Sequence, residues 1–188
     1  MPDWKPIVGK AFSTDEFDAY CHTLTWNSWR PSFLVLHNTA VPDLSQEPNG
    51  FSSASMNGFV SYYRDQLHWS AGPHLFVDDH RIWVFTPMTT PGVHSPSWNN
   101  LSIGLEMLGD YATDAFDSGR GLAVRINAVA AIRILFSILG WPGDNIRLHR
   151  EDPLTTHHCP GNHVVKQAVI QDIQASLLEV HSGEHTWA

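Results

Sequence analysis

The sequence contains little cysteine and little positive charge. Cys21 and Cys159 are the two cysteines among 188 residues, too few for a disulfide framework, although they could pair in an oxidising compartment. Eleven Lys and Arg residues stand against nineteen Asp and Glu residues, which gives a formal net charge of −8, and no basic run is present. Nucleic-acid binding and electrostatic docking to an anionic membrane both need a basic surface. We therefore expect no nucleic-acid partner and no such membrane contact.

The sequence also predicts no targeting segment and no membrane-spanning segment. Residues 1–6 show no basic segment followed by an apolar one, so no signal peptide is predicted. No window of about 18 residues is continuously apolar, so we expect no integral membrane segment. These two points predict a protein that is made in the cytoplasm. They do not say where it acts.

What is present is ordinary globular composition, with 43% hydrophobic and 16% charged residues. The length favours a single domain over residues 1–188, with a polar, loose tail at 181–188. We expect a monomer. No repeat or interdomain linker interrupts the chain.

Hydrophobic periodicity and turn residues predict an α/β fold. Apolar runs and alternation predict strands over 33–37, 74–77, 81–85, 101–107 and 145–149. Helical spacing, with a capping box that begins at Ser13 and a C-terminal Gly140, predicts helices over about 13–24, 53–66, 123–139 and 162–178. This order indicates a mixed central β-sheet flanked by helices on both faces.

The segment Arg147–Gly161 carries the clearest chemistry. It places His149 and Cys159 ten residues apart, and thiolate and imidazole are ligands that zinc prefers. His37 ends a second apolar strand, so a side-by-side arrangement of the two strand ends would complete a His2Cys site with one open position. Three protein ligands and an open position are typical of catalytic zinc. The alternative is a buried cysteine beside ordinary surface histidines.

Four short segments, in this order and spacing, carry a resemblance to a known family. They are Leu36–Thr39, His74–Asp78, Asn100–Glu106, and His149–Glu151 with Cys159–Gly161. Together they make the chain resemble the zinc-dependent N-acetylmuramoyl-L-alanine amidases, a family shared by phage endolysins and peptidoglycan recognition proteins. The resemblance covers residues 33–161 and implies a catalytic core over about 30–180.

The resemblance implies that His37, His149 and Cys159 bind one zinc ion. It implies that Glu106 is the general base, as in some branches of the family; the alternative is a structural pair with an arginine such as Arg147. His157 occupies the position whose side chain stabilises the oxyanion, and the alternative is a solvated loop histidine. In an extended segment residues i and i+2 face the same way, so His157 should point toward the metal and its neighbour His158 away.

Three further residues are candidates for substrate contact. His94 matches a family histidine on the loop that lines the cleft, and Trp98 follows on the same loop. His74 lies in a matching segment, but it heads a strand and could be a core residue. Two positions depart from the family pattern. Pro73 stands where some phage members carry a catalytic tyrosine, and Asn38 stands where many relatives have a second histidine that is not a ligand.

The expected activity is hydrolysis of the amide bond between N-acetylmuramic acid and L-alanine, with peptidoglycan or a muropeptide as substrate. We favour a lytic, endolysin-type enzyme that acts on the cell wall after release. A cytosolic amidase that recycles soluble anhydro-muropeptides is one alternative. A module that binds peptidoglycan without cleaving it is another, although such relatives usually lack the cysteine ligand.

Overall fold

The computed structural model describes residues 3–182, with side chains through residue 175, as one α/β domain. The strands are β1 (Lys10–Phe12), β2 (Phe33–Asn38), β3 (Leu75–Val77), β4 (Ile82–Val84), β5 (Ser102–Met107) and β6 (Ile146–Leu148). The helices are α1 (Thr14–His22), α2 (Ser53–Val60), α3 (Gly119–Leu139) and α4 (Lys166–Ser182). A π-helical segment, η1 (Ser61–Gln66), continues α2, and a 3₁₀ turn, η2 (His149–Glu151), follows β6.

The six strands form one mixed sheet in the order β1-β4-β3-β5-β2-β6. β4 pairs antiparallel with β1 and β3, whereas β5 pairs parallel with β3 and β2, and β2 pairs parallel with β6. The central parallel strands β2 and β5 are buried along almost their whole length, as expected of strands covered on both faces. The predicted mixed sheet is confirmed.

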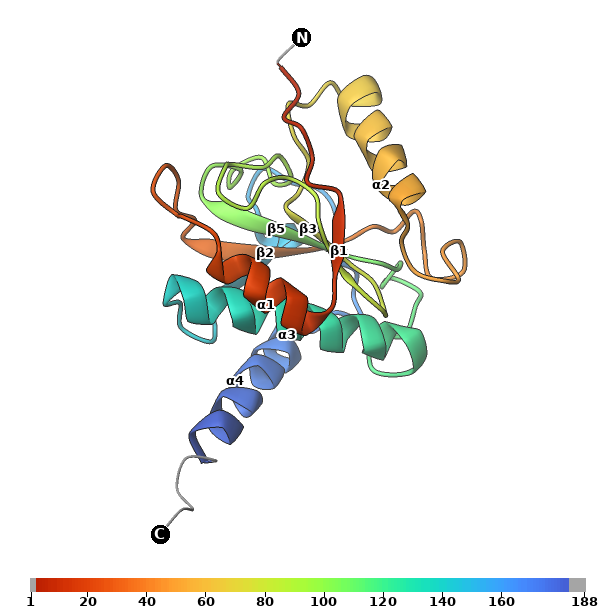
Figure 1. The fold of residues 1–188 in the computed structure, drawn as a ribbon. Helices are drawn as coiled ribbons and strands as arrows, with labels where there is room; N and C mark the ends of the chain where they lie inside the picture. The colour runs from red at the N-terminus through yellow and green to blue at the C-terminus, as the bar shows by residue number, and fades with distance from the viewer. Residues whose placement is uncertain (1–2, 183–188) are drawn as a thin grey trace.

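Helices cover both faces of this sheet (Figure 1). On one face α3 packs against β3, β4 and β5, and α1 packs on α3. On the other face Phe59 of α2 stacks on Phe76 of β3 at a centroid distance of 4.3 Å. Because α2 covers only the β3 part of its face, the ends of β2, β5 and β6 are left for a cleft.

The long helix α3 bears on the expectation that the chain has no integral membrane segment. It is long and apolar enough, by composition alone, to cross a membrane, and it is the one such helix in the described part of the chain. Its contacts with α1, α4 and three strands identify it as the core helix of the domain. It ends at Gly140, which adopts the left-handed conformation (φ +68°) typical of a helix C-terminus.

Most predicted elements are found, with shifted ends. The predicted capping box of α1 is present, since Ser13 and Glu16 bond reciprocally. The edge strand β1 is not predicted, because its three residues show no alternation and owe their conformation to pairing with β4. α3 begins four residues before the predicted start, and α4 both begins and ends later than predicted. The predicted loose tail overlaps α4 at His181 and Ser182, and its remainder, 183–188, lies outside the described residues.

Strand register brings the candidate site together. In the parallel pair of β2 and β5, His37 lies opposite Glu106. On the other side of β2, Leu36 lies opposite Leu148, so His149 follows β6 beside the end of β2. The sequence predicts His149 as the last residue of a strand over 145–149. In the structure it is the first residue of η2.

Asp152 fixes the loop that follows η2. Its carboxylate accepts hydrogen bonds from the Ser95 hydroxyl and from the backbone N–H groups of Ser97 and Leu154. Burial alone raises the pKa of this carboxyl, but the hydrogen bonds outweigh burial and lower the pKa to about 2. The ionised Asp152 therefore ties the loop that carries His149 to the loop that carries His94.

We predict that Asp152→Ala lowers the free energy of unfolding by about 2–3 kcal/mol, because hydrogen bonds to a buried charged group are among the stronger ones. Urea unfolding in the presence of a chelator measures this value without a metal contribution. Asp65→Ala is the matched control, since the exposed Asp65 pairs with its neighbour Arg64. Equal stability of the two variants would contradict the role of Asp152.

Candidate active site

Three side chains from distant parts of the chain form one cluster. His37 comes from the end of β2, His149 from η2, and Cys159 from the loop after it. Each offers one ligand atom, and these atoms all lie within 4.8 Å of one another. The His37 and His149 rings are 4.4 Å apart between centroids. The predicted ligand set is thus assembled in one place.

The residues of this cluster fit a zinc ion. Two imidazoles and one thiol form the donor set of a three-ligand zinc site. Nε2 of His149 is buried and has no hydrogen-bond partner in the described part of the chain. A buried imidazole nitrogen without a partner is costly in free energy, so the His149 ring is available for a further ligand. The three residues that the family resemblance assigns as zinc ligands therefore lie close enough together to bind one ion.

Cys159 is held at the cluster by the neighbouring strand. Its Sγ accepts a hydrogen bond from the backbone N–H of Asn38 at 3.3 Å. Burial raises the pKa of the Cys159 thiol, and the nearby Glu106 raises it further. Since zinc binds the thiolate, metal binding at this cluster has to release the thiol proton.

Glu106 lies beside the cluster on the neighbouring strand. Its Oε1 is 3.8 Å from Nδ1 of His37, and only 8% of the residue surface is exposed. Burial raises the pKa of the Glu106 carboxyl to about 8. The alternative pairing with Arg147 is not formed, because that guanidinium lies over the rings of Phe33 and Trp98. Glu106 is therefore left facing the cleft.

His157 and His158 both line the hollow that contains the cluster. The His157 ring stacks on His149 at 5.9 Å with an interplanar angle of 24°. Both residues are exposed and line the same hollow, so the expected difference in direction between His157 and His158 stays a prediction. His157 is the one with a ring contact to a candidate ligand.

His94 lies behind the cluster. Its ring is 5% exposed, Nδ1 is 3.1 Å from Nε2 of His37, and Nε2 is 3.2 Å from the carbonyl oxygen of Ser102. Burial lowers the pKa of His94 to about 3, so the ring is neutral. A Cβ atom on Gly104 would lie 2.5 Å from this ring, so the room that small residues leave on β5 is filled by His94.

His74 and Trp98 lie in structural positions. His74 is fully buried, accepts a hydrogen bond from the Gly104 N–H, and bonds the carbonyl of Thr90 through Nε2. Trp98 is buried edge-on against Phe33 at 5.6 Å. Neither residue lines the hollows around the metal cluster. The geometry of both favours the core role over substrate contact.

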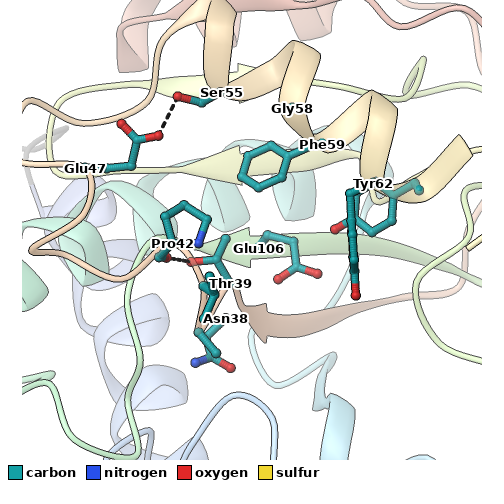
Figure 2. A pocket seen from close by; sticks show the side chains of 12 residues that line it. Asn38, Thr39, Pro42, Glu47, Ser55, Gly58, Phe59, Tyr62 and Glu106 are labelled. Atoms are coloured by element: carbon teal, nitrogen blue, oxygen red, sulfur yellow. Dashed lines mark hydrogen bonds between the residues drawn. The ribbon is translucent and has the colours of Figure 1, made fainter. Parts of the chain in front are cut away.

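The cluster lies in the middle of a cleft of three adjoining hollows. The central hollow measures about 370 Å³ and contains the three candidate ligands. A second hollow of about 530 Å³ shares Asn38, Tyr62, Tyr63 and Glu106 with it; Figure 2 shows Glu106 projecting into this space from β5. A third, of about 400 Å³, shares Trp69, His94, His149 and His157 with the central one.

Several residues of the cleft were not predicted from the sequence. Tyr62 and Tyr63 fall within the helix predicted over 53–66, and the sequence assigns no site role to them or to Trp69. Glu47, which accepts a hydrogen bond from Ser55, was not singled out (Figure 2). The helical spacing of Tyr63 identifies a buried face, but it does not show that this face ends at a cleft.

Curated relatives of this chain are peptidoglycan-recognition proteins. The Holotrichia diomphalia peptidoglycan-recognition protein 1 is 26% identical over 133 residues, which cover 63% of this chain and 66% of that protein. The Drosophila melanogaster protein SC1a is 23% identical over 138 residues, covering 71% and 69%. The chain thus spans just under two thirds of the Holotrichia protein, and about half of the Drosophila SC2 proteins.

Solved structures share the fold. The endolysin N-acetylmuramoyl-L-alanine amidase LysCS from Clostridium intestinale superposes with a TM-score of 0.59 at 20% identity, covering 83% of this chain and 92% of that one. Drosophila PGRP-LB gives a TM-score of 0.59 at 16% identity, with 88% of each chain covered. At such identities the likeness shows the fold alone.

The family model described as N-acetylmuramoyl-L-alanine amidase matches residues 27–162. This range is well over half of the chain. It contains Glu106 and the three candidate zinc ligands, His37, His149 and Cys159. The chain therefore belongs to the N-acetylmuramoyl-L-alanine amidase family.

Proposed function

We propose that this protein hydrolyses the amide bond between N-acetylmuramic acid and the L-alanine of the peptide stem, with zinc as cofactor. The observation that carries the proposal is the His37, His149 and Cys159 cluster in the middle of an open cleft, with the Glu106 carboxylate beside it. A three-ligand site in a cleft is the arrangement of a catalytic metal rather than a closed structural one.

The three ligands would hold zinc at the centre of the cleft. When bound, zinc supplies a Lewis acid that polarises a carbonyl group and lowers the pKa of water. The chain's own contribution is to fix the ligands. All three residues of β6 pair with Leu34–Leu36 of β2, and the Asn38 N–H holds the sulfur of Cys159.

Glu106 acts as the general base. It is the carboxylate nearest the cluster that faces the cleft, and no arginine neutralises it in the described part of the chain. In its ionised form, which is the minor form at neutral pH because burial raises the pKa of this carboxyl to about 8, it takes a proton from the attacking water while the water oxygen bonds to the amide carbon. General-base assistance of this kind contributes roughly 10²–10⁴-fold to turnover.

His157 donates a hydrogen bond to the carbonyl oxygen as negative charge develops there. Its exposed ring, stacked on His149, leaves the edge free for the substrate. The C–N bond then breaks, and the proton held by Glu106 passes to the leaving amine of L-alanine. The products are a lactyl carboxylate and a free peptide N-terminus.

The shape of the cleft agrees with an amide bond that joins a sugar to a peptide. Such a substrate needs room on both sides of the reacting carbon, and hollows lie on both sides of the central one. Trp69, Tyr62 and Tyr63 supply aromatic surface along it, which suits sugar rings and apolar stem residues.

We favour the lytic form of this activity, with action on the cell wall after release. The openness of the cleft to solvent at His157 and His158 suits a polymeric substrate. A recycling amidase that cleaves soluble anhydro-muropeptides would use the same site. A binding module without catalysis is disfavoured by the complete ligand set, since Cys159 is present.

We predict that Cys159→Ser loses zinc and hydrolysis together, because a hydroxyl replaces the thiolate ligand. Metal content by mass spectrometry and amide cleavage are measured on the same preparation. Cys21→Ala is the matched control: this buried thiol belongs to α1 and should be dispensable for both readouts. Full zinc occupancy in Cys159→Ser would remove Cys159 from the ligand set.

We predict that Glu106→Ala keeps zinc but lowers kcat by roughly 10²–10⁴-fold, because only the proton acceptor is removed. The measurement is release of L-alanine-terminated peptide under substrate saturation, with zinc content determined in parallel. Turnover close to wild type with a full complement of zinc would show that another group accepts the proton.

We predict that incubation with intact sacculi creates new N-terminal alanine, and that a chelator abolishes it. Labelling of amine and reducing ends identifies the bond that is cut. New reducing sugar ends would refute an amidase. Cleavage of soluble anhydro-muropeptide, with sacculi left intact, would support the recycling enzyme instead of the lytic one.

A further inference from the structure

Two groups behind the candidate ligands, the Ser102 carbonyl and the His94 ring, are linked to the ligand His37 by consecutive hydrogen bonds. The carbonyl oxygen of Ser102 is 3.2 Å from Nε2 of His94, and Nδ1 of His94 is 3.1 Å from Nε2 of His37. All three residues are buried, so water does not compete for these bonds. The hydrogen bonds end at the His37 ring, whose Nδ1 is the nitrogen that remains on the Glu106 side.

The backbone carbonyl of Ser102 decides which atom donates in each of these hydrogen bonds. A carbonyl oxygen only accepts, so Nε2 of His94 must carry the proton. Nδ1 of the neutral His94 is then an acceptor, which requires Nε2 of His37 to be the donor. The neutral His37 ring therefore has its lone pair on Nδ1, the form in which an imidazole nitrogen binds a metal.

The opposite arrangement is unfavourable. If Nδ1 of His37 carried the proton and faced Glu106 at 3.8 Å, Nε2 of His37 would become an acceptor. His94 would then have to donate through Nδ1, and its bare Nε2 would face the Ser102 carbonyl oxygen. Two lone pairs would meet in a buried position, which costs the free energy of an unmade hydrogen bond.

The surroundings hold His94 in this position. A Cβ atom on Gly104 would come within 2.5 Å of the ring, so the strand provides space at this position. The Asn99 side chain accepts hydrogen bonds from the backbone N–H groups of His94 and Ser95. The His94 loop is thus fixed from two sides, by the sheet and by its own turn.

We propose that His94 is a positioning residue for the metal ligand His37. Together with the Ser102 carbonyl, it sets the tautomer and ring orientation of His37 before a metal arrives. The inference rests on the zinc site of the proposed function, but it concerns metal affinity and not hydrolysis. Partners of this kind typically contribute 10- to 100-fold to metal affinity.

Two variants of similar size separate the hydrogen bond from packing. Asn and Leu have nearly the same shape, and both lack the donor to Ser102, but only Asn offers an acceptor near the position of Nδ1. We expect His94→Leu to weaken zinc binding about 10- to 100-fold. We expect His94→Asn to lie closer to the wild type than to His94→Leu. Competition with a chromophoric chelator measures both.

His74→Leu is the matched control. His74 is as buried as His94 and also uses both ring nitrogens, but it bonds the backbone at Gly104 and Thr90 and not a candidate ligand. This variant should lose stability while zinc affinity stays within a few-fold of wild type, on the order of the error in such comparisons. Thermal unfolding of the metal-free proteins shows that all variants are folded.

A spectroscopic readout tests the tautomer directly. In ¹⁵N-labelled, metal-free protein at neutral pH, long-range ¹H–¹⁵N correlations should show His37 and His94 both protonated at Nε2. Protonation of His37 at Nδ1 would overturn the proposal, as would equal zinc affinity of His94→Leu and His94→Asn. Loss of affinity in His74→Leu as large as in His94→Leu would reduce the effect to packing. If zinc binds as expected but sacculi are not cleaved, only the proposed function fails.

Discussion

The parallel pairing of β2 with β5 on one side and β6 on the other is the constraint on which the site depends. Parallel strands have their carboxyl ends at the same edge of a sheet, so residues that end them become neighbours. His37 thereby meets Glu106 in register, and His149 follows β6 into the same space. A shift of β2 by one residue would turn His37 to the opposite face, toward α3, and would separate it from His149 and Cys159.

The fold was largely predictable because its strongest signals are local. The apolar runs of β2 and β5, the capping box at Ser13 and the terminal Gly140 of α3 are all visible without tertiary information. β1 was missed because its conformation is imposed by β4. The candidate ligands were only partly predictable in this way. The position of His37 near the end of an apolar strand and the spacing of His149 and Cys159 indicated a site, and the resemblance to the family completed the ligand set.

The distinction between groups that face the cleft and groups that lie behind it was not predictable from the sequence. His94 and His157 are both loop histidines in matching segments, yet one is buried and the other exposed. That difference arises from Gly104, a strand residue that leaves space for one ring. It also arises from Asp152, whose carboxylate ties the two loops together. Contacts between distant segments therefore decide which of the two histidines is buried. Such contacts leave no periodic pattern in the sequence.

The negative charge of the chain constrains how a substrate is held. The acidic residues Glu47, Glu106 and Asp110 line the cleft, and among the described residues that line its three hollows there is no Lys or Arg. Long-range attraction therefore cannot draw an anionic polymer to this cleft. Under the proposed function, affinity would come from short-range contacts, namely the proposed zinc ion, hydrogen bonds and the aromatic faces of Tyr62 and Trp69. Binding of this kind would depend on the fit of the substrate at the reacting bond, so the backbone contacts that fix the candidate ligands would also fix where the substrate is held.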